Sequence, residues 1–214
     1  MRFKSALKKT WNFLWHSDSI WSWLANVVIA FIMIRFVVYP LLGLLFATSF
    51  PIVAVVSESM EHGLHNQQIC GAYQEDFKES FNSYWTKCGL WYEQRNLTQQ
   101  EFKKFRFQNG FDKGDIILIR GTPPEKLKVG DVIIFQGDKP QPIIHRIVKK
   151  WQEDGRYYFQ TKGDHNQDSI NGQWGETKIT EERILGKGVL RIPYLGWIKI
   201  VFVEAVGPLG WSVD

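Results

Sequence analysis

The chain has 214 residues, enough for one soluble domain plus a membrane anchor. Its formal net charge is only +4, and four basic residues precede the first acidic one: Arg2, Lys4, Lys8 and Lys9. The other 22 Lys and Arg residues balance the 22 Asp and Glu residues. A neutral body argues against nucleic acid as a partner, because such proteins carry a basic face. The basic flank predicts an N-terminus that stays in the cytoplasm.

The segment from Ile20 to Val56 is apolar and contains one charged residue, Arg35. An apolar run of this length predicts a membrane span. In one arrangement, a single span contains Arg35, at a cost of about 2.5–3.5 kcal/mol for an Arg at the bilayer centre. In the other, an interfacial helix over 11–34 precedes a span that begins at Phe36.

The order of these segments predicts three parts. Residues 1–19 form a cytoplasmic basic and aromatic N-terminus, residues 20–50 a transmembrane anchor, and residues 51–214 an extracytoplasmic domain. Because no cleavage-type motif of small residues follows a short apolar core, we expect an uncleaved anchor. The expected location is therefore the cell membrane, crossed once.

Short β-branched and aromatic runs follow the anchor, punctuated by Gly, Pro and Asp. Consecutive runs are joined without a connector of helix length, which predicts antiparallel pairing. The fold class is thus a membrane-anchored, mainly β protein, with an N-terminal transmembrane helix, an antiparallel β domain and a partly helical insertion. The expected strands are Pro51–Val56, Asp115–Arg120, Asp131–Phe135, Ile143–Val148, Arg156–Thr161 and Gly188–Ile192.

Residues 61–112 are polar and aromatic, with few β-branched residues, and are interpreted as an insertion. Thr98 to Glu101 has the spacing of a capping box, which predicts a short helix reaching about Phe107. Cys70 and Cys88 are the only cysteines. In an exported domain they favour one disulfide, with two reduced thiols as the alternative. Farther along, residues 197–206 form an apolar C-terminal segment, interpreted as a short helix or a membrane-contacting one.

The candidate chemistry begins with Ser57-Glu-Ser-Met60, directly after the first predicted strand. A serine becomes a nucleophile when a nearby base takes its proton. His145 lies on an apolar strand face, where desolvation favours the neutral imidazole that a base requires. A histidine satisfied by a neighbouring side chain is the structural alternative. Asp164 and Asp168 follow the next strand and are candidates for the acid that orients the imidazole; as residues of a turn they also have an ordinary structural explanation.

Taken together, these motifs resemble the type I signal peptidases, in the branch found in archaea and the endoplasmic reticulum. Ser57-Glu-Ser-Met60 is similar to the serine box of that family, and Ile144-His-Arg-Ile147 to the box that carries its base. The strand Gly130–Phe135, the acidic box Lys162–Asn166 followed by Asp168, and Arg191–Gly196 complete the likeness. The match spans about 51–196, with 61–112 as an insertion.

The resemblance implies that Ser59 is the nucleophile, that His145 is the base and that Asp168 is the third member, with Asp164 as its rival. It also implies an oxyanion site made by the Ser59 amide with the Ser57 hydroxyl. We expect Val53, Val55 and Met60 to form shallow substrate pockets, and neither a metal nor a cofactor to take part.

The resemblance therefore predicts a serine endopeptidase that removes N-terminal signal peptides from exported preproteins at the outer membrane surface. Its expected partners are preprotein signal peptides and the lipid bilayer, with the protein translocation machinery as a further candidate. The alternative is a catalytically inactive, membrane-anchored β module whose binding surface is the insertion 61–112.

Overall fold

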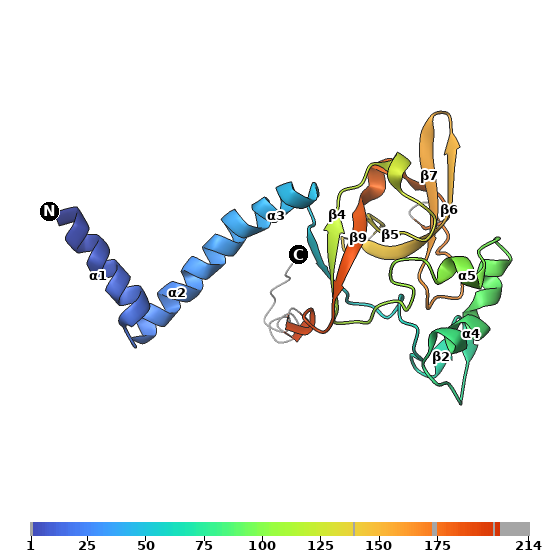
Figure 1. Cartoon of the computed structure of the whole chain (residues 1–214), viewed down its shortest axis with the longest axis horizontal. Helices are drawn as coiled ribbons and strands as arrows, with labels where there is room; N and C mark the ends of the chain where they lie inside the picture. Colours follow the sequence, from blue (N-terminus) through green and yellow to red (C-terminus); the bar gives the residue numbers. More distant parts are fainter. Residues whose placement is uncertain (1, 139, 173–174, 199, 202–214) are drawn as a thin grey trace. The chain divides into compact units, whose positions relative to one another are not determined.

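The computed structural model describes residues 2–138, 140–172, 175–198 and 200–201. These residues fall into two compact units, Met1–Leu45 and Phe46–Asp214. Figure 1 traces the helices of the first unit in blue, and the sheet and insertion of the second in the colours that follow.

The first unit is helical, with α1 over Arg2–His16, α2 over Ile20–Met33, the π-helical turn η1 over Ile34–Val38, and α3 over Tyr39–Phe46. The Ser19 hydroxyl starts α2 by accepting from the Trp21 N–H at 3.3 Å. The second of the two predicted arrangements, with one interfacial helix over 11–34, does not match the structure, because the helix is interrupted between His16 and Ile20. Ser22 and Asn26 of α2 bond back to carbonyl groups of α1, which fixes this bend.

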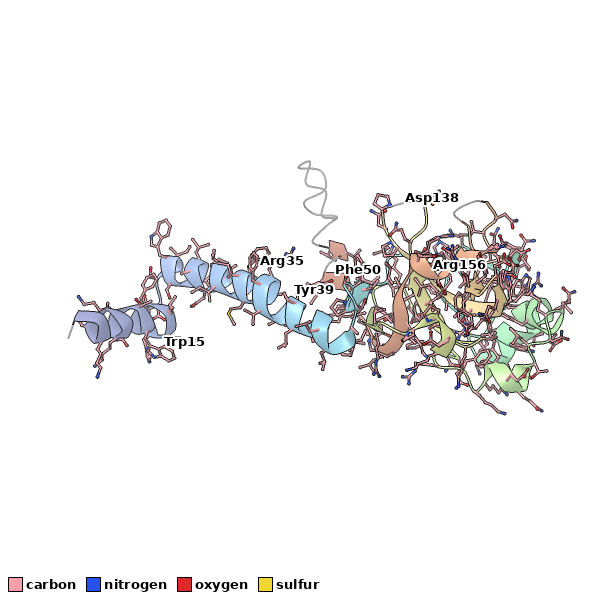
Figure 2. The ribbon with its side chains drawn as sticks, turned by 90° about the horizontal axis from the view of Figure 1, so that it is seen from above. Trp15, Arg35, Tyr39, Phe50, Asp138 and Arg156 are labelled. Carbon is pink, nitrogen blue, oxygen red and sulfur yellow. A yellow bond between two sulfur atoms is a disulfide. The ribbon has the colours of Figure 1, made fainter. Side chains whose placement is uncertain are left out.

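The helical run Ile20–Phe46 has 27 residues and is long and apolar enough to cross a membrane. Arg35 lies within it (Figure 2), which is the arrangement with the charge inside the span. The π-helical turn ends two residues before Pro40, which has no N–H to donate. The Tyr39 N–H instead donates to the Ile34 carbonyl, five residues back, so the helix widens by one residue. The helix ends at Phe46, four residues before the predicted end of the anchor.

In the second unit, seven of the described strands form a curled sheet of order β1-β4-β9-β5-β6-β7-β8, with every neighbouring pair antiparallel (Figure 1). The strands β2 and β3 of the insertion form a separate antiparallel pair. The predicted fold class is confirmed. Asp154 and Gly155, both at positive φ, form the tight turn between β6 and β7. The strands are β1 (Ile52–Ala54), β4 (Ile116–Arg120), β5 (Val132–Phe135), β6 (Ile143–Glu153), β7 (Arg156–Lys162), β8 (Ile179–Thr180) and β9 (Ile184–Ile192).

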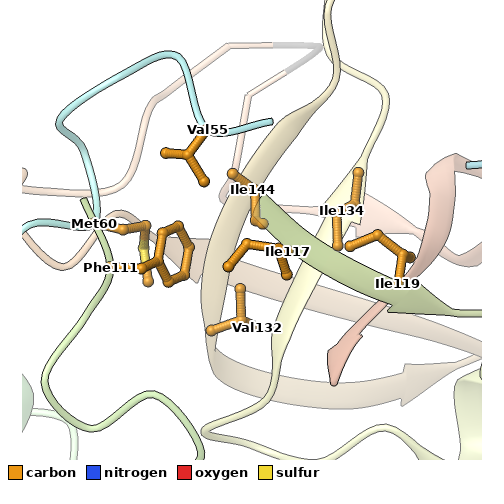
Figure 3. Packing of buried hydrophobic residues seen from close by; sticks show 8 residues of the cluster. All are labelled: Val55, Met60, Phe111, Ile117, Ile119, Val132, Ile134 and Ile144. Carbon is orange, nitrogen blue, oxygen red and sulfur yellow. The ribbon is translucent and has the colours of Figure 1, made fainter. Parts of the chain in front are cut away.

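The core lies on both faces of β5. Val132 and Ile134 face a cluster that includes Met60 and Phe111 (Figure 3), whereas Ile133 and Phe135 face another cluster around Phe159. Burial on both sides explains the unbroken apolar sequence of this strand. It also makes β5 a rigid support for its neighbour β6, which carries His145.

The insertion packs its own apolar cluster against Val148 of β6. Thr98 and Glu101 form the predicted capping box, but α5 ends at Phe102 rather than near Phe107. Cys70 and Cys88 form the predicted disulfide. The elements of the insertion are β2 (Gln68–Ile69), β3 (Ala72–Tyr73), α4 (Phe81–Glu93) and α5 (Gln99–Phe102), and two 3-10 turns elsewhere are η2 (Pro124–Lys126) and η3 (Glu181–Arg183).

The apolar segment predicted over 197–206 lies mostly outside the described residues, since 199 and 202–206 are not among them.

Candidate active site

Ser59 lies in the loop that follows β1 and is held there by backbone hydrogen bonds. The Glu61 N–H donates to the Glu58 carbonyl at 3.1 Å, which closes a tight turn around Ser59. The His165 N–H donates to the Ser59 carbonyl at 2.9 Å. The loop around Gly163 to His165 therefore braces the nucleophile loop directly, although the two are about a hundred residues apart in the chain.

The Ser59 hydroxyl meets the imidazole of His145. Ser59 Oγ and His145 Nε2 are 2.8 Å apart, which is hydrogen-bonding distance for a nucleophile and its general base. His145 is 4% exposed, whereas Ser59 is half-buried. A hydroxyl open to a substrate, with its base shielded behind it, suits nucleophilic catalysis.

The other ring nitrogen of His145 faces Glu176. Nδ1 and Glu176 Oε1 form a short hydrogen bond, in which Nδ1–H donates when the imidazole is neutral. The Thr161 hydroxyl donates to the same oxygen at 2.9 Å, and the Ile170 N–H donates to Oε2 at 2.8 Å. Glu176 is fully buried and firmly held, so it fixes the tautomer that leaves Nε2 free to accept the serine proton.

Gly163 provides the close approach that this geometry needs. A Cβ at this position would lie 2.7 Å from His145 Nε2, from the Ser59 carbonyl oxygen and from Asn166 Nδ2. Any side chain here would push the base and the nucleophile loop apart. The glycine of the Gly163-Asp164 pair thus has a steric reason to be in this box.

The structure places the predicted orienting acid, Asp168, away from His145. Its carboxylate is 59% exposed and accepts from the Trp91 indole N–H at 3.0 Å and from the Ser169 N–H at 2.7 Å. The bond from Trp91 ties the turn to α4 of the insertion. Among the described residues, Glu176 occupies the position at Nδ1 that was predicted for Asp168, so that assignment is corrected.

The alternative acid, Asp164, belongs to a second, buried polar cluster around Arg146. Its two oxygens accept from Arg146 Nε at 2.8 Å and Nη2 at 2.6 Å, in a bidentate pair with both side chains fully buried. His62 Nε2 lies 2.9 Å from Oδ2, and the Tyr92 hydroxyl donates to Oδ1 at 3.2 Å. Asp164 has no hydrogen bond to His145 within the described chain, so its prediction as the orienting acid is corrected as well.

Arg146 is fully satisfied in this cluster. Its remaining N–H groups donate to the carbonyls of Arg106, Gly130 and Phe107 at 2.7–3.1 Å. Burial raises the pKa of Asp164, but the adjacent guanidinium lowers it more, so this pKa stays well below its usual range. Burial lowers the pKa of His62, which favours the neutral ring as a donor to Asp164.

A cleft of about 900 Å³ opens in front of Ser59 and His145. One wall is formed by 53–57, which includes Val53 and Val55, and the other by 141–144. Ser57 also lines the cleft, and its Oγ lies 3.2 Å from Ser59 Oγ. Ser57 is thus close to the position at which a substrate carbonyl would meet the nucleophile.

Met60, predicted as a substrate-binding residue, lies in the core instead. It is fully buried beside Phe111 (Figure 3) and does not line the cleft. The tight turn at Ser59 explains the difference, because it sends the next side chain inward. The prediction for Met60 is therefore corrected.

Sequence reasoning missed Glu176 and the role of Gly163. Glu176 lies in a connection without strand character, between β7 and β8, and belongs to none of the motifs. The available signal was weak: a single carboxylate preceded by glycine, at Gly175-Glu176. Gly163 carried a stronger signal, because a glycine that directly follows a strand indicates a close approach of another group.

A hydroxyl, an imidazole and a carboxylate in this order define a candidate serine hydrolase centre. The chain is similar to "Signal peptidase complex catalytic subunit SEC11C" of Homo sapiens, with 26% identity over 95 residues, 42% of this chain and 50% of that protein. The catalytic subunit sec11 of Sclerotinia sclerotiorum is 32% identical over 98 residues, 44% of this chain and 57% of that protein. The corresponding subunit of Colletotrichum graminicola is 28% identical over 98 residues.

No protein-family model matches the chain. The homologues are catalytic subunits of signal peptidase complexes, which confirms the resemblance stated from the sequence motifs. The chain spans about half the length of the curated relatives that it matches.

Proposed function

We propose that the chain is a membrane-anchored serine endopeptidase of the signal peptidase type, which removes N-terminal signal peptides from exported preproteins. The observation that carries this proposal is the 2.8 Å contact between Ser59 Oγ and His145 Nε2 at the wall of a large cleft. The similarity to signal peptidase catalytic subunits supports the substrate class.

In this mechanism, Ser59 Oγ attacks the scissile carbonyl while His145 Nε2 takes its proton. Glu176 stabilises the imidazolium that forms and keeps the ring in position. His145 then gives the proton to the leaving amine, and a water molecule activated by the same imidazole releases the acyl group from Ser59. The Ser59 N–H and the Ser57 hydroxyl hold the oxyanion, and loss of one such donor typically costs about 2.7–4 kcal/mol.

The walls of the cleft suit an extended substrate. β1 lies at the edge of the sheet and pairs only with β4 among the described strands. Ile143 to His145 pair with β5, while the pairing of β6 with β7 begins at Arg146. Each wall can therefore add a strand through its remaining backbone groups. The apolar side chains of Val53 and Val55 would face small substrate residues.

The proposed topology has residues 1–19 in the cytoplasm, the helix Ile20–Phe46 across the cell membrane, and residues 51–214 on the outer side. The basic flank and the length of the helix support this orientation. A tethered enzyme meets a tethered substrate at high effective concentration. The protein translocation machinery would deliver that substrate.

The test is cleavage of a labelled preprotein by the full chain in liposomes. Ser59→Ala should reduce the rate constant to background, a loss of about 10⁶-fold in comparable serine proteases. The melting temperature should not change, because only one half-buried hydroxyl is removed. Ser57→Ala serves as the matched control, with a smaller loss of about 10²–10³-fold.

A covalent serine-directed inhibitor separates this function from an inactive binding module. The peptidase should be labelled at Ser59, and the Ser59→Ala variant should not be. Retained cleavage by Ser59→Ala, or labelling at another serine, would contradict the proposal.

A further inference from the structure

A second cavity, of about 400 Å³, lies apart from Ser59 and is lined by four cationic side chains: Arg106, Arg120, Lys126 and Lys187. It contains none of the residues that line the cleft of the candidate active site. The proposed peptidase mechanism makes no use of these side chains.

The charges at this cavity are poorly compensated by the protein. Arg120 of β4 and Lys187 of β9 are directly opposite each other in the sheet, and like charges in that position are destabilising. Lys187 Nζ reaches Asp131 at 2.7 Å. Within the described part of the chain, Arg106, Arg120 and Lys126 form no ion pair within 4.0 Å. An anion with several oxygens, such as a phosphate group, would relieve this repulsion.

The cavity lies next to the end of the apolar helix. Gly121, which lines it, donates its N–H to the carbonyl of Phe46 at 2.8 Å. Phe46 is the last residue of the helix that is long and apolar enough to cross a membrane. With this helix across a bilayer, Phe46 would lie at the level of the lipid headgroups, and Gly121 is hydrogen-bonded to it.

The surface beside the cavity favours a lipid over a free phosphate. Ile52, Leu118 and Leu190 are paired across β1, β4 and β9. Ile52 is 36% exposed and Leu190 is 51% exposed. Leu118 and Arg120 are two residues apart in β4 and therefore lie on the same face of the sheet. The apolar row thus shares a face with the Arg120–Lys187 pair. Apolar residues beside basic ones are typical of surfaces that lie in the membrane interface.

We propose that this cavity binds the phosphate of an anionic phospholipid headgroup and so holds the domain against the bilayer. The site is independent of the chemistry at Ser59. Arg120 and Lys187 would contact the phosphate oxygens, with Arg106 and Lys126 adding to the positive potential.

The test uses the full chain in a non-ionic detergent, titrated with short-chain phosphatidylglycerol, short-chain phosphatidylcholine or inorganic phosphate, and followed by calorimetry. Phosphatidylglycerol should bind more tightly than the other two ligands. Combining Arg120→Gln with Lys187→Gln should weaken its binding about tenfold or more, because it removes two of the cationic side chains that attract the anionic headgroup. The control, Lys87→Gln with Lys104→Gln, removes the same charge elsewhere and should leave the affinity unchanged.

Two further variants keep the proposal testable if the double variant unfolds. Arg120→Lys with Lys187→Arg retains both charges and should retain binding. Asp131→Asn removes the nearby anion and should tighten binding. Equal affinity for phosphatidylcholine, equal affinity for inorganic phosphate, or an equal loss in the Lys87 and Lys104 control would each overturn the proposal.

Discussion

His145 and Arg146 are consecutive residues of β6, yet they belong to two polar clusters with different tasks. His145 joins Ser59 and Glu176 beside the cleft. Arg146 joins Asp164 in a cluster without solvent access. The alternation of a β-strand places the two side chains on opposite faces. Gly163 and Asp164 repeat the division, since the glycine lies against Ser59 and His145 while the aspartate binds Arg146.

The difference shows that an acidic residue in a recognisable motif need not be the acid that orients the base. The clusters have similar composition, with an acid, a base and hydroxyl groups in each. They differ in the partner of the carboxylate, which is an imidazole in one and a guanidinium in the other. The buried Arg–Asp pair joins β6 to the loop that follows β7, whereas a carboxylate behind an imidazole orients the ring and fixes its tautomer.

Among the variants that distinguish the His145 cluster from the Arg146 cluster, Glu176→Gln should cause the largest loss of activity. The amide cannot stabilise the imidazolium, and it favours the wrong tautomer of His145. Preprotein cleavage should fall by about 10⁴-fold, as for the equivalent change in other triads. The measurement is the rate constant over a range of pH in liposomes.

Asp168→Asn is the matched control for Glu176→Gln, since it changes an exposed carboxylate on the same loop by the same chemistry. It should leave the rate almost unchanged. A larger loss for Asp168→Asn than for Glu176→Gln would restore the original assignment.

Arg146→Met should act on stability. It leaves the Asp164 carboxylate buried without its main partner, which typically costs 3–5 kcal/mol. Chemical unfolding of the full chain in detergent would measure this loss. The double variant Arg146→Met with Asp164→Leu should be less destabilised than the single one, because it removes the orphaned charge. If the double variant is the less stable, the pair is a net stabilising interaction and the comparison needs revision.

Removal of the disulfide, by Cys70→Ser with Cys88→Ser, should give a smaller loss. The bridge joins residues 18 apart in the insertion that covers Asp164. The chain-entropy model predicts about 3 kcal/mol for a loop of this size. Chemical unfolding with and without reductant provides the measurement. At low temperature the folded protein should still cleave, whereas a loss of turnover without a loss of stability would link the insertion to the catalytic cluster.

Acidification should lower the stability of the fold gradually, with the smallest effect of the changes considered. The pKa of Asp164 is lowered in the fold, so its contribution is present above the usual value of 3.8 and is lost as the pH falls below it. The pKa of His62 is also lowered, so the unfolded chain takes up the proton first and stability decreases as the pH falls below 6.5. Thermal unfolding at a series of pH values would show both steps. Asp164→Asn should remove the lower step and His62→Gln the upper one; an unchanged profile in both variants would exclude this cluster as the cause.

Local sequence rules predicted much of the fold. Short β-branched and aromatic runs, punctuated by Gly, Pro and Asp, indicated six of the strands. α4 was missed because its aromatic residues pack into the separate cluster of the insertion, and period alone does not separate such a segment from a loop. Ser59 and His145 came from motifs, and the structure brings them into contact.

Glu176 could not be found in this way. Its position depends on how the connection between β7 and β8 folds back over Thr161. Such a return is set by tertiary packing rather than by local spacing. Asp168 was favoured because the family resemblance implies an essential Asp a few residues after the Gly-Asp pair, whereas the structure places Glu176 at His145 Nδ1.

The tight turn at Asp154-Gly155 has a consequence for errors in folding. The turn and the irregularity between Ile147 and Lys149 together set which residues of β6 face each way. If the part of β6 before Ile147 slipped by one position, Arg146 would point toward Ser59. His145 would then be buried next to Asp164. One mistake would thus disable turnover and destabilise the domain together, so a misregistered chain would be discarded rather than persist as a folded, inactive enzyme.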